Sequence, residues 1–71
     1  MSPQDYEVDI RPLSPDDGGG FVATAPELPG CMSDGETPEE ALRNAYDAIA
    51  CRIEGAQEMG RAVPEPRRAA A

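Results

Sequence analysis

The stretch Pro26–Leu42, which reads PELPGCMSDGETPEEAL, places turn residues directly before a helix start. In its first half, Pro26 and Pro29 fix their own φ angles and push the preceding residues toward extended conformations. Gly30 and Gly35 can adopt positive φ angles without steric cost. This half therefore predicts the end of one strand, a tight loop, and a short strand that ends in a turn.

The second half of the stretch carries the signals of a helix N-terminus. Thr37 stands at the N-cap position, Pro38 follows as the first helical residue, and Glu40 lies three residues after Thr37. This spacing predicts a capping box, in which the Thr37 hydroxyl accepts the Glu40 N–H and the Glu40 carboxylate accepts the Thr37 N–H. We expect the helix to run from Thr37 to roughly Gly60, where the glycine supplies a C-cap.

The expected helix has an apolar stripe at helical spacing, which predicts burial of that face against another element. The stripe consists of Leu42, Ala45, Tyr46, Ile49, Ile53 and Ala56. Cys51 falls outside the stripe, so it is either solvent-exposed or in contact with another chain.

Upstream of this stretch, the sequence predicts a hairpin of two strands. Residues Asp5–Arg11 alternate strictly between acidic or basic residues and apolar ones, which is typical of a strand with one buried face. The second strand is expected at Gly20–Ala25, and Leu13–Gly20 forms the connecting loop. The third strand is expected at about Gly30–Asp34. The helix stripe and the apolar face of this sheet are the only two surfaces available to bury each other.

The predicted fold class is therefore α+β, a two-layer sandwich in which one long helix covers a three-stranded antiparallel sheet. Two prolines, Pro64 and Pro66, exclude a helix near the C-terminus, and Val63–Arg67 could form a fourth edge strand or an extended arm. A chain of 71 residues holds one domain, expected at residues 1–66, with a C-terminal tail at residues 67–71.

Composition restricts the possible partners and cofactors. The net charge is −8, with 14 acidic residues and six arginines, so the chain should repel nucleic acid and suit a basic protein partner. Hydration of a soluble surface is the simpler explanation of the same charge. No signal peptide or membrane-spanning segment is visible, so we expect a cytoplasmic protein. Two cysteines and no histidine argue against a zinc site, and we expect no cofactor.

Individual residues provide little support for catalysis. Asp9 could hold a metal ion on the first strand, but its alternation with Glu7 and Arg11 favours a solvated strand face. Cys31 has no histidine to activate it as a nucleophile, so a small buried residue is expected there. Cys51 could be an interface or redox thiol, or simply an exposed one. The Gly18–Gly20 run does not lead into a helix and is interpreted as a hairpin turn. We expect no enzymatic activity.

The order of motifs resembles the HicB antitoxins of bacterial HicA–HicB toxin–antitoxin systems. The resemblance rests on FVATAPELPG at Phe21–Gly30, on the Gly35-Glu36-Thr37 turn, and on PEEALRNAYDAI opening the helix. It implies a partial RNase H-like fold with strand–strand–strand–helix–strand order. It also implies an antitoxin that binds and masks a small basic HicA-type mRNA-cleaving toxin. The alternative is a stand-alone HicB-like module that binds a protein or a ligand and has no toxin partner.

The resemblance and the charge pattern together suggest contact residues. Acidic loop residues and the PELPG turn are the candidates for toxin contact, and hydration or turn geometry would explain them equally well. The candidate partner-binding residues are Asp16, Asp17, Glu27, Leu28, Pro29, Asp34 and Glu36. Relatives often carry a DNA-binding segment after this domain, and we expect no direct nucleic-acid binding by this chain alone.

The expected helix, about 35 Å long, is longer than the sheet beneath it, so its apolar C-terminal end should overhang. Small chains often need a partner for stability. We therefore expect a homodimer or homotetramer, formed through the helix end or an edge strand. The candidate interface residues are Ile53, Ala56, Met59 and Val63.

Overall fold

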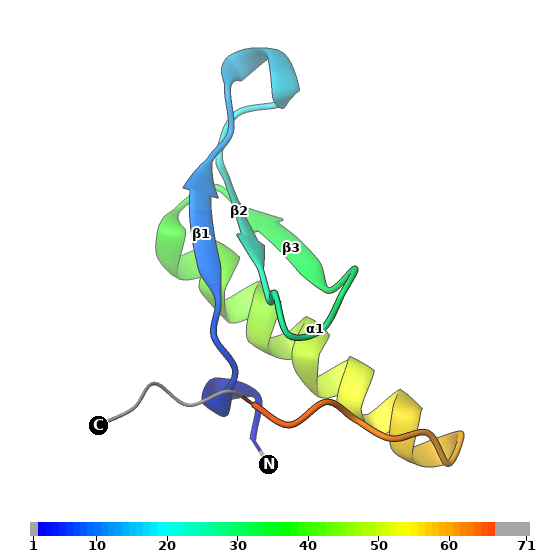
Figure 1. The fold of residues 1–71 in the computed structure, drawn as a ribbon. Helices are drawn as coiled ribbons and strands as arrows, with labels where there is room; N and C mark the ends of the chain where they lie inside the picture. Colours follow the sequence, from blue (N-terminus) through cyan, green and yellow to red (C-terminus); the bar gives the residue numbers. More distant parts are fainter. Residues whose placement is uncertain (1, 67–71) are drawn as a thin grey trace.

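The computed structural model describes residues 2–66 as one sheet covered by one helix (Figure 1). The elements are η1 (Pro3–Asp5), β1 (Asp9–Pro12), η2 (Pro15–Asp17), β2 (Phe21–Thr24), β3 (Met32–Gly35) and α1 (Pro38–Glu58). The strands form an antiparallel sheet in the order β1-β2-β3. The predicted α+β fold with β-β-β-α order is confirmed. The tail predicted at residues 67–71 lies outside the described residues.

The N-terminus of α1 is capped as expected, with one difference. The Thr37 hydroxyl accepts a hydrogen bond from the Glu40 N–H at 3.1 Å. The Glu40 carboxylate accepts from the N–H of Glu36 at 3.1 Å rather than from that of Thr37. Our prediction of the second bond was wrong by one residue. The long glutamate side chain extends past the cap and ties the helix to the turn after β3.

The C-terminus of α1 ends at a glycine, as predicted. Gly60 has a φ of 69°, and its N–H donates to the Gln57 carbonyl at 3.1 Å. The Arg61 N–H donates to the Ala56 carbonyl at 2.8 Å. These two bonds form a Schellman motif, which pairs carbonyls that the end of a helix would otherwise leave free.

The core lies between α1 and the sheet and has two parts. At the N-terminal end of α1, small residues allow close approach: Ala23, Ala41 and Ala45 are buried there. Further along, larger side chains fill a wider space, namely Tyr6, Ala25, Leu28, Cys31, Ile49 and Ile53. The predicted stripe is therefore shifted, because Ala41 is fully buried whereas Leu42 is only half-buried.

The first strand is shorter and later than the alternation predicted. Asp5 belongs to η1, and β1 begins only at Asp9. Tyr6 is buried in the core although it lies outside the strand. Ile10 is 36% exposed, because α1 packs mainly against β3 and β2 and barely reaches β1. Alternation correctly identified an extended segment, but not which part of it pairs.

Residues 61–66 run back from the end of α1 toward η1, as the orange segment of Figure 1 shows. The Tyr6 hydroxyl donates a 2.6 Å hydrogen bond to the Pro64 carbonyl, and Val63 packs against the core. No strand forms within residues 61–66. The extended-arm alternative therefore describes this segment, and the fourth edge strand is not seen in the described part of the chain.

Candidate functional site

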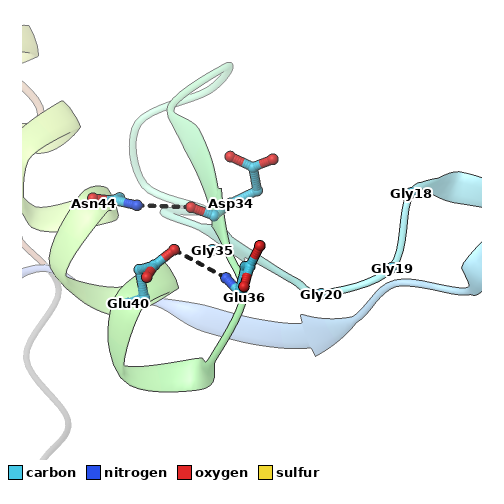
Figure 2. A pocket seen from close by; sticks show the side chains of 8 residues that line it. All are labelled: Gly18, Gly19, Gly20, Asp34, Gly35, Glu36, Glu40 and Asn44. Carbon is cyan, nitrogen blue, oxygen red and sulfur yellow. Dashed lines mark hydrogen bonds between the residues drawn. The ribbon is translucent and has the colours of Figure 1, made fainter.

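A hollow of about 510 Å³ lies where the β1–β2 hairpin, the end of β3 and the start of α1 meet (Figure 2). We call it the acidic corner. Its lining residues are Gly18, Gly19, Gly20, Asp34, Gly35, Glu36, Glu40 and Asn44. Three of these residues are acidic and none is basic, so the hollow has a negative potential that would attract cationic groups.

Glycines create the shape of this corner. Gly18, Gly19 and Gly20 all have positive φ angles, between 71° and 103°, which turn the hairpin loop over the hollow. A Cβ on Gly20 would stand 2.6 Å from the Gly35 carbonyl oxygen. We expected Gly35 to need a positive φ, but it does not have one. It is required because its bare backbone contacts the helix.

Hydrogen bonds hold the backbone of the corner and leave its carboxylates at the surface. The Asn44 side-chain amide donates to the Asp34 carbonyl at 2.9 Å, and the Glu40 carboxylate accepts from the Glu36 N–H (Figure 2). Asp34, Glu36 and Glu40 are all exposed. Within residues 2–66, no group of three or more Asp, Glu, Cys or His side chains is arranged to hold a metal ion. The corner is suited to contact with a charged surface.

Two further acidic candidates lie at the tip of the hairpin. Asp16 and Asp17 form η2 and are exposed. The Ser14 hydroxyl donates to the Asp17 carboxylate at 2.9 Å. The glycine run that follows them lines the acidic corner. Asp16 and Asp17 therefore extend the negative surface beyond the hollow itself.

The PELPG turn lies at the opposite end of the sheet and is largely occupied by its own contacts. Leu28 is buried in the core. The Glu27 carboxylate accepts from the Glu7 N–H at 3.2 Å, and the Pro29 carbonyl accepts from the Arg52 guanidinium at 2.9 Å. The candidate partner residues thus fall into two separate groups. Their role in partner binding stays a prediction.

A second hollow, which we call the terminal groove, lies between the last turns of α1 and residues 61–64. Its volume is about 440 Å³, and its walls are mostly apolar. The candidate interface residues Ala56, Met59 and Val63 line it, whereas Ile53 is buried in the core. Met59 is 67% exposed. Whether these residues form an oligomer interface also stays a prediction.

The two cysteines are free and have different environments. Cys31 is buried, as expected, and burial raises the pKa of its thiol, an effect that the nearby Arg52 charge partly opposes. Cys51 is exposed and lines the terminal groove. The sequence did not reveal the roles of Glu40 and Asn44 in the corner. Their spacing of four residues on α1 was the available signal, because it places them on the same helix face.

Comparisons with known proteins agree with this architecture. The family described as HicB_like antitoxin of bacterial toxin-antitoxin system matches residues 6–71. An uncharacterized 14.9 kDa protein from the rep-hol intergenic region of Haemophilus phage HP1 is 44% identical over 46 residues. That match covers 65% of this chain but only 35% of the phage protein. A UPF0150 protein of Thermoplasma acidophilum is 36% identical over 52 residues, which cover 73% of this chain and 75% of the relative.

No solved structure shows a significant match to the chain. In the described residues, α1 is not apolar enough to cross a membrane. The family match spans nearly the whole chain and includes the sheet, the helix and both hollows. The chain therefore belongs to the HicB-like antitoxin family of bacterial toxin–antitoxin systems.

Proposed function

We propose that this chain is an antitoxin that binds a small basic ribonuclease toxin of the HicA type and sterically masks its catalytic surface. The observation that carries the proposal is the acidic corner, where the exposed carboxylates of Asp34, Glu36 and Glu40 have no basic neighbour in the lining. Family membership supports the same conclusion.

Charge and shape explain how such a complex would form. A net charge of −8 attracts a basic toxin from a distance and speeds the encounter. Close contact then places toxin side chains against the corner, where the Glu36 and Glu40 carboxylates are already positioned by the hydrogen bond between these residues. Preorganised carboxylates lose little conformational freedom on binding. Occupation of the toxin surface excludes RNA, so no chemical step by this chain is needed.

The test is co-expression with a small basic toxin encoded beside this chain, followed by purification of the pair. Growth arrest by the toxin should be relieved, and RNA cleavage by the purified toxin should stop when this chain is added. The corner variant Asp34→Asn/Glu36→Gln should weaken binding about tenfold and slow association, with the difference shrinking at high salt.

A matched control separates the corner from general charge. The variant Asp47→Asn/Glu54→Gln removes the same charge from exposed positions of α1 outside the corner. It should bind the toxin nearly as well as the unmodified chain. Equal weakening in both variants would show that only net charge matters, and absence of any complex would overturn the proposal.

The stand-alone alternative is favoured by one observation, the apolar terminal groove. A binding module without a toxin would use such a groove to retain a small molecule or a peptide. Native mass spectrometry of the chain purified alone checks this function. A retained molecule that is lost in Ala56→Trp, which fills the groove, would favour it over the antitoxin role.

A further inference from the structure

The two edge strands of the sheet, β1 and β3, direct different main-chain groups outward. In an antiparallel pair, alternate residues hydrogen-bond to the partner strand and the others point away. The Leu13 N–H donates to the Gly20 carbonyl at 2.8 Å, so in this register Asp9 and Arg11 also face β2. The N–H and C=O of Ile10 therefore point to the free edge, as does the C=O of Pro12.

The β3 edge is closed by the helix. The Ala25 N–H donates to the Cys31 carbonyl at 3.0 Å, which makes Asp34 an outward-pointing residue of β3. Its carbonyl already accepts a hydrogen bond from Asn44 of α1 (Figure 2). An incoming strand would have to displace this bond, so β3 is protected against pairing.

The β1 edge is open. All four residues of β1 are exposed, and the Ile10 side chain is 36% exposed. Paired residues share a face of the sheet, and Ile10 pairs with the buried Ala23, so Ile10 projects on the α1 side. Because α1 lies under β2 and β3, this apolar side chain and its main-chain groups lack a covering element.

We propose that the β1 edge pairs with the β1 edge of a second copy of this chain, antiparallel about a two-fold axis at Ile10. The sequence Asp9-Ile10-Arg11 is complementary to itself in this arrangement. The N–H and C=O of Ile10 pair with those of the partner's Ile10, and the Val8 N–H donates to the partner's Pro12 carbonyl. Asp9 then lies opposite the partner's Arg11, twice by symmetry, which is a favourable cross-strand pair.

The other two-fold registers that align outward-pointing residues of this segment are disfavoured. An axis at Val8 would place Glu7 opposite the partner's Asp9, and like charges directly opposite are destabilising. An axis at Pro12 would remove both central hydrogen bonds, because proline has no N–H. Within one chain, Asp9 and Arg11 face the uncharged Thr24 and Val22 of β2. Only the axis at Ile10 gives both charges an opposite partner while keeping the central hydrogen bonds.

Charge reversal at the two ends of this triplet tests the register. Asp9→Arg and Arg11→Asp should each raise the dimer dissociation constant at least about tenfold, measured by sedimentation over a concentration series. An equimolar mixture of the two variants should form a heterodimer, and the double swap Asp9→Arg/Arg11→Asp should dimerise like the unmodified chain. Circular dichroism checks that each variant is folded, which we expect because both side chains are exposed.

Net charge alone predicts a different result, which makes the test decisive. Asp9→Arg changes the net charge from −8 to −6, because a positive charge replaces a negative one. General repulsion between copies would therefore fall and the dimer would tighten. Tightening in this variant, or an unmodified chain that stays monomeric at every concentration, would overturn the proposal.

Disulfide trapping provides a second measurement. Residues in a hydrogen-bonded antiparallel pair have Cα atoms about 5.5 Å apart, which a disulfide can span. In a Cys51→Ser background, Ile10→Cys should form a cross-linked dimer quickly under mild oxidation. The control, Met32→Cys, places a thiol at a position of β3 that is 58% exposed in the unmodified chain. Equally fast cross-linking of the control would contradict the proposal.

Discussion

Gly35 at the end of β3 and Ala41 of α1 are in direct backbone contact: a Cβ added to Gly35 would stand 2.5 Å from the Ala41 nitrogen. The atom would also lie 2.8 Å from the Glu40 carbonyl carbon. Both neighbours are backbone, so neither can rotate away. This contact sets how closely the helix start approaches the sheet, and it shapes one wall of the acidic corner.

The first prediction concerns this contact. Gly35→Ala should destabilise the fold by about 2–3 kcal/mol, because helix and strand must separate to admit the methyl group. Urea unfolding measures the change. Gly55→Ala is the matched control: it lies inside α1 with no atom within 4 Å of the added Cβ, and should stabilise by about 1 kcal/mol. Equal effects of the two substitutions would show that the packing described here is wrong.

The second prediction concerns the N-cap of α1. Thr37→Ala removes the acceptor for the Glu40 N–H and should lower the free energy of unfolding by about 1 kcal/mol. Glu40→Gln keeps a carbonyl oxygen that can still accept from the Glu36 N–H, so it should cost less. Thermal unfolding of both variants checks the order. A larger loss in Glu40→Gln would mean that its charge matters more than the threonine cap.

The third prediction is a dependence of stability on alkaline pH. Burial, and secondarily the negative charges of Glu27, Asp5 and Glu65, raises the pKa of Tyr6 above its ordinary value of about 10. The unfolded chain therefore releases the phenolic proton at lower pH than the folded chain does. The stability that Tyr6 contributes is fully present below pH 10 and is lost as pH rises toward the raised folded pKa.

Tyr6→Phe isolates this effect. The variant loses the hydrogen bond to the Pro64 carbonyl, which should cost about 1 kcal/mol near neutral pH. The stability difference between the unmodified chain and the variant should be constant below pH 10 and shrink above it. Tyr46 and Cys31 are present in both proteins, so their titrations cancel. A difference that does not change with pH would show that Tyr6 keeps its ordinary pKa.

The fourth prediction concerns the two thiols. Cys51 is exposed, whereas Cys31 is buried and burial raises its pKa. The thiolate is the reactive form, so iodoacetamide at neutral pH should modify Cys51 first and Cys31 only after local or global opening. Mass spectrometry after timed labelling measures both rates. In urea the two rates should become similar, and fast labelling of Cys31 in the folded chain would contradict its placement in the core.

Local signals in the sequence determined the elements of this protein and their order. The Thr37 cap, the glycine at position 60 and the apolar stripe of the helix act over three to four residues, so they can be identified without knowledge of the fold. The antiparallel sheet followed because the stripe had only one apolar surface to cover. The buried position of Cys31 was predicted correctly on the same basis.

Only the tertiary structure decided what depends on the distance between elements. The close approach of Gly35 and Ala41 decides that alanine 41, rather than leucine 42, faces the sheet, since a larger side chain has no room there. The acidic corner combines residues from the hairpin, β3 and α1 that no sequence spacing connects. The position of α1 under β2 and β3 leaves Ile10 exposed. Sequence periodicity states which face of an element is apolar, but packing determines how much of that face is covered.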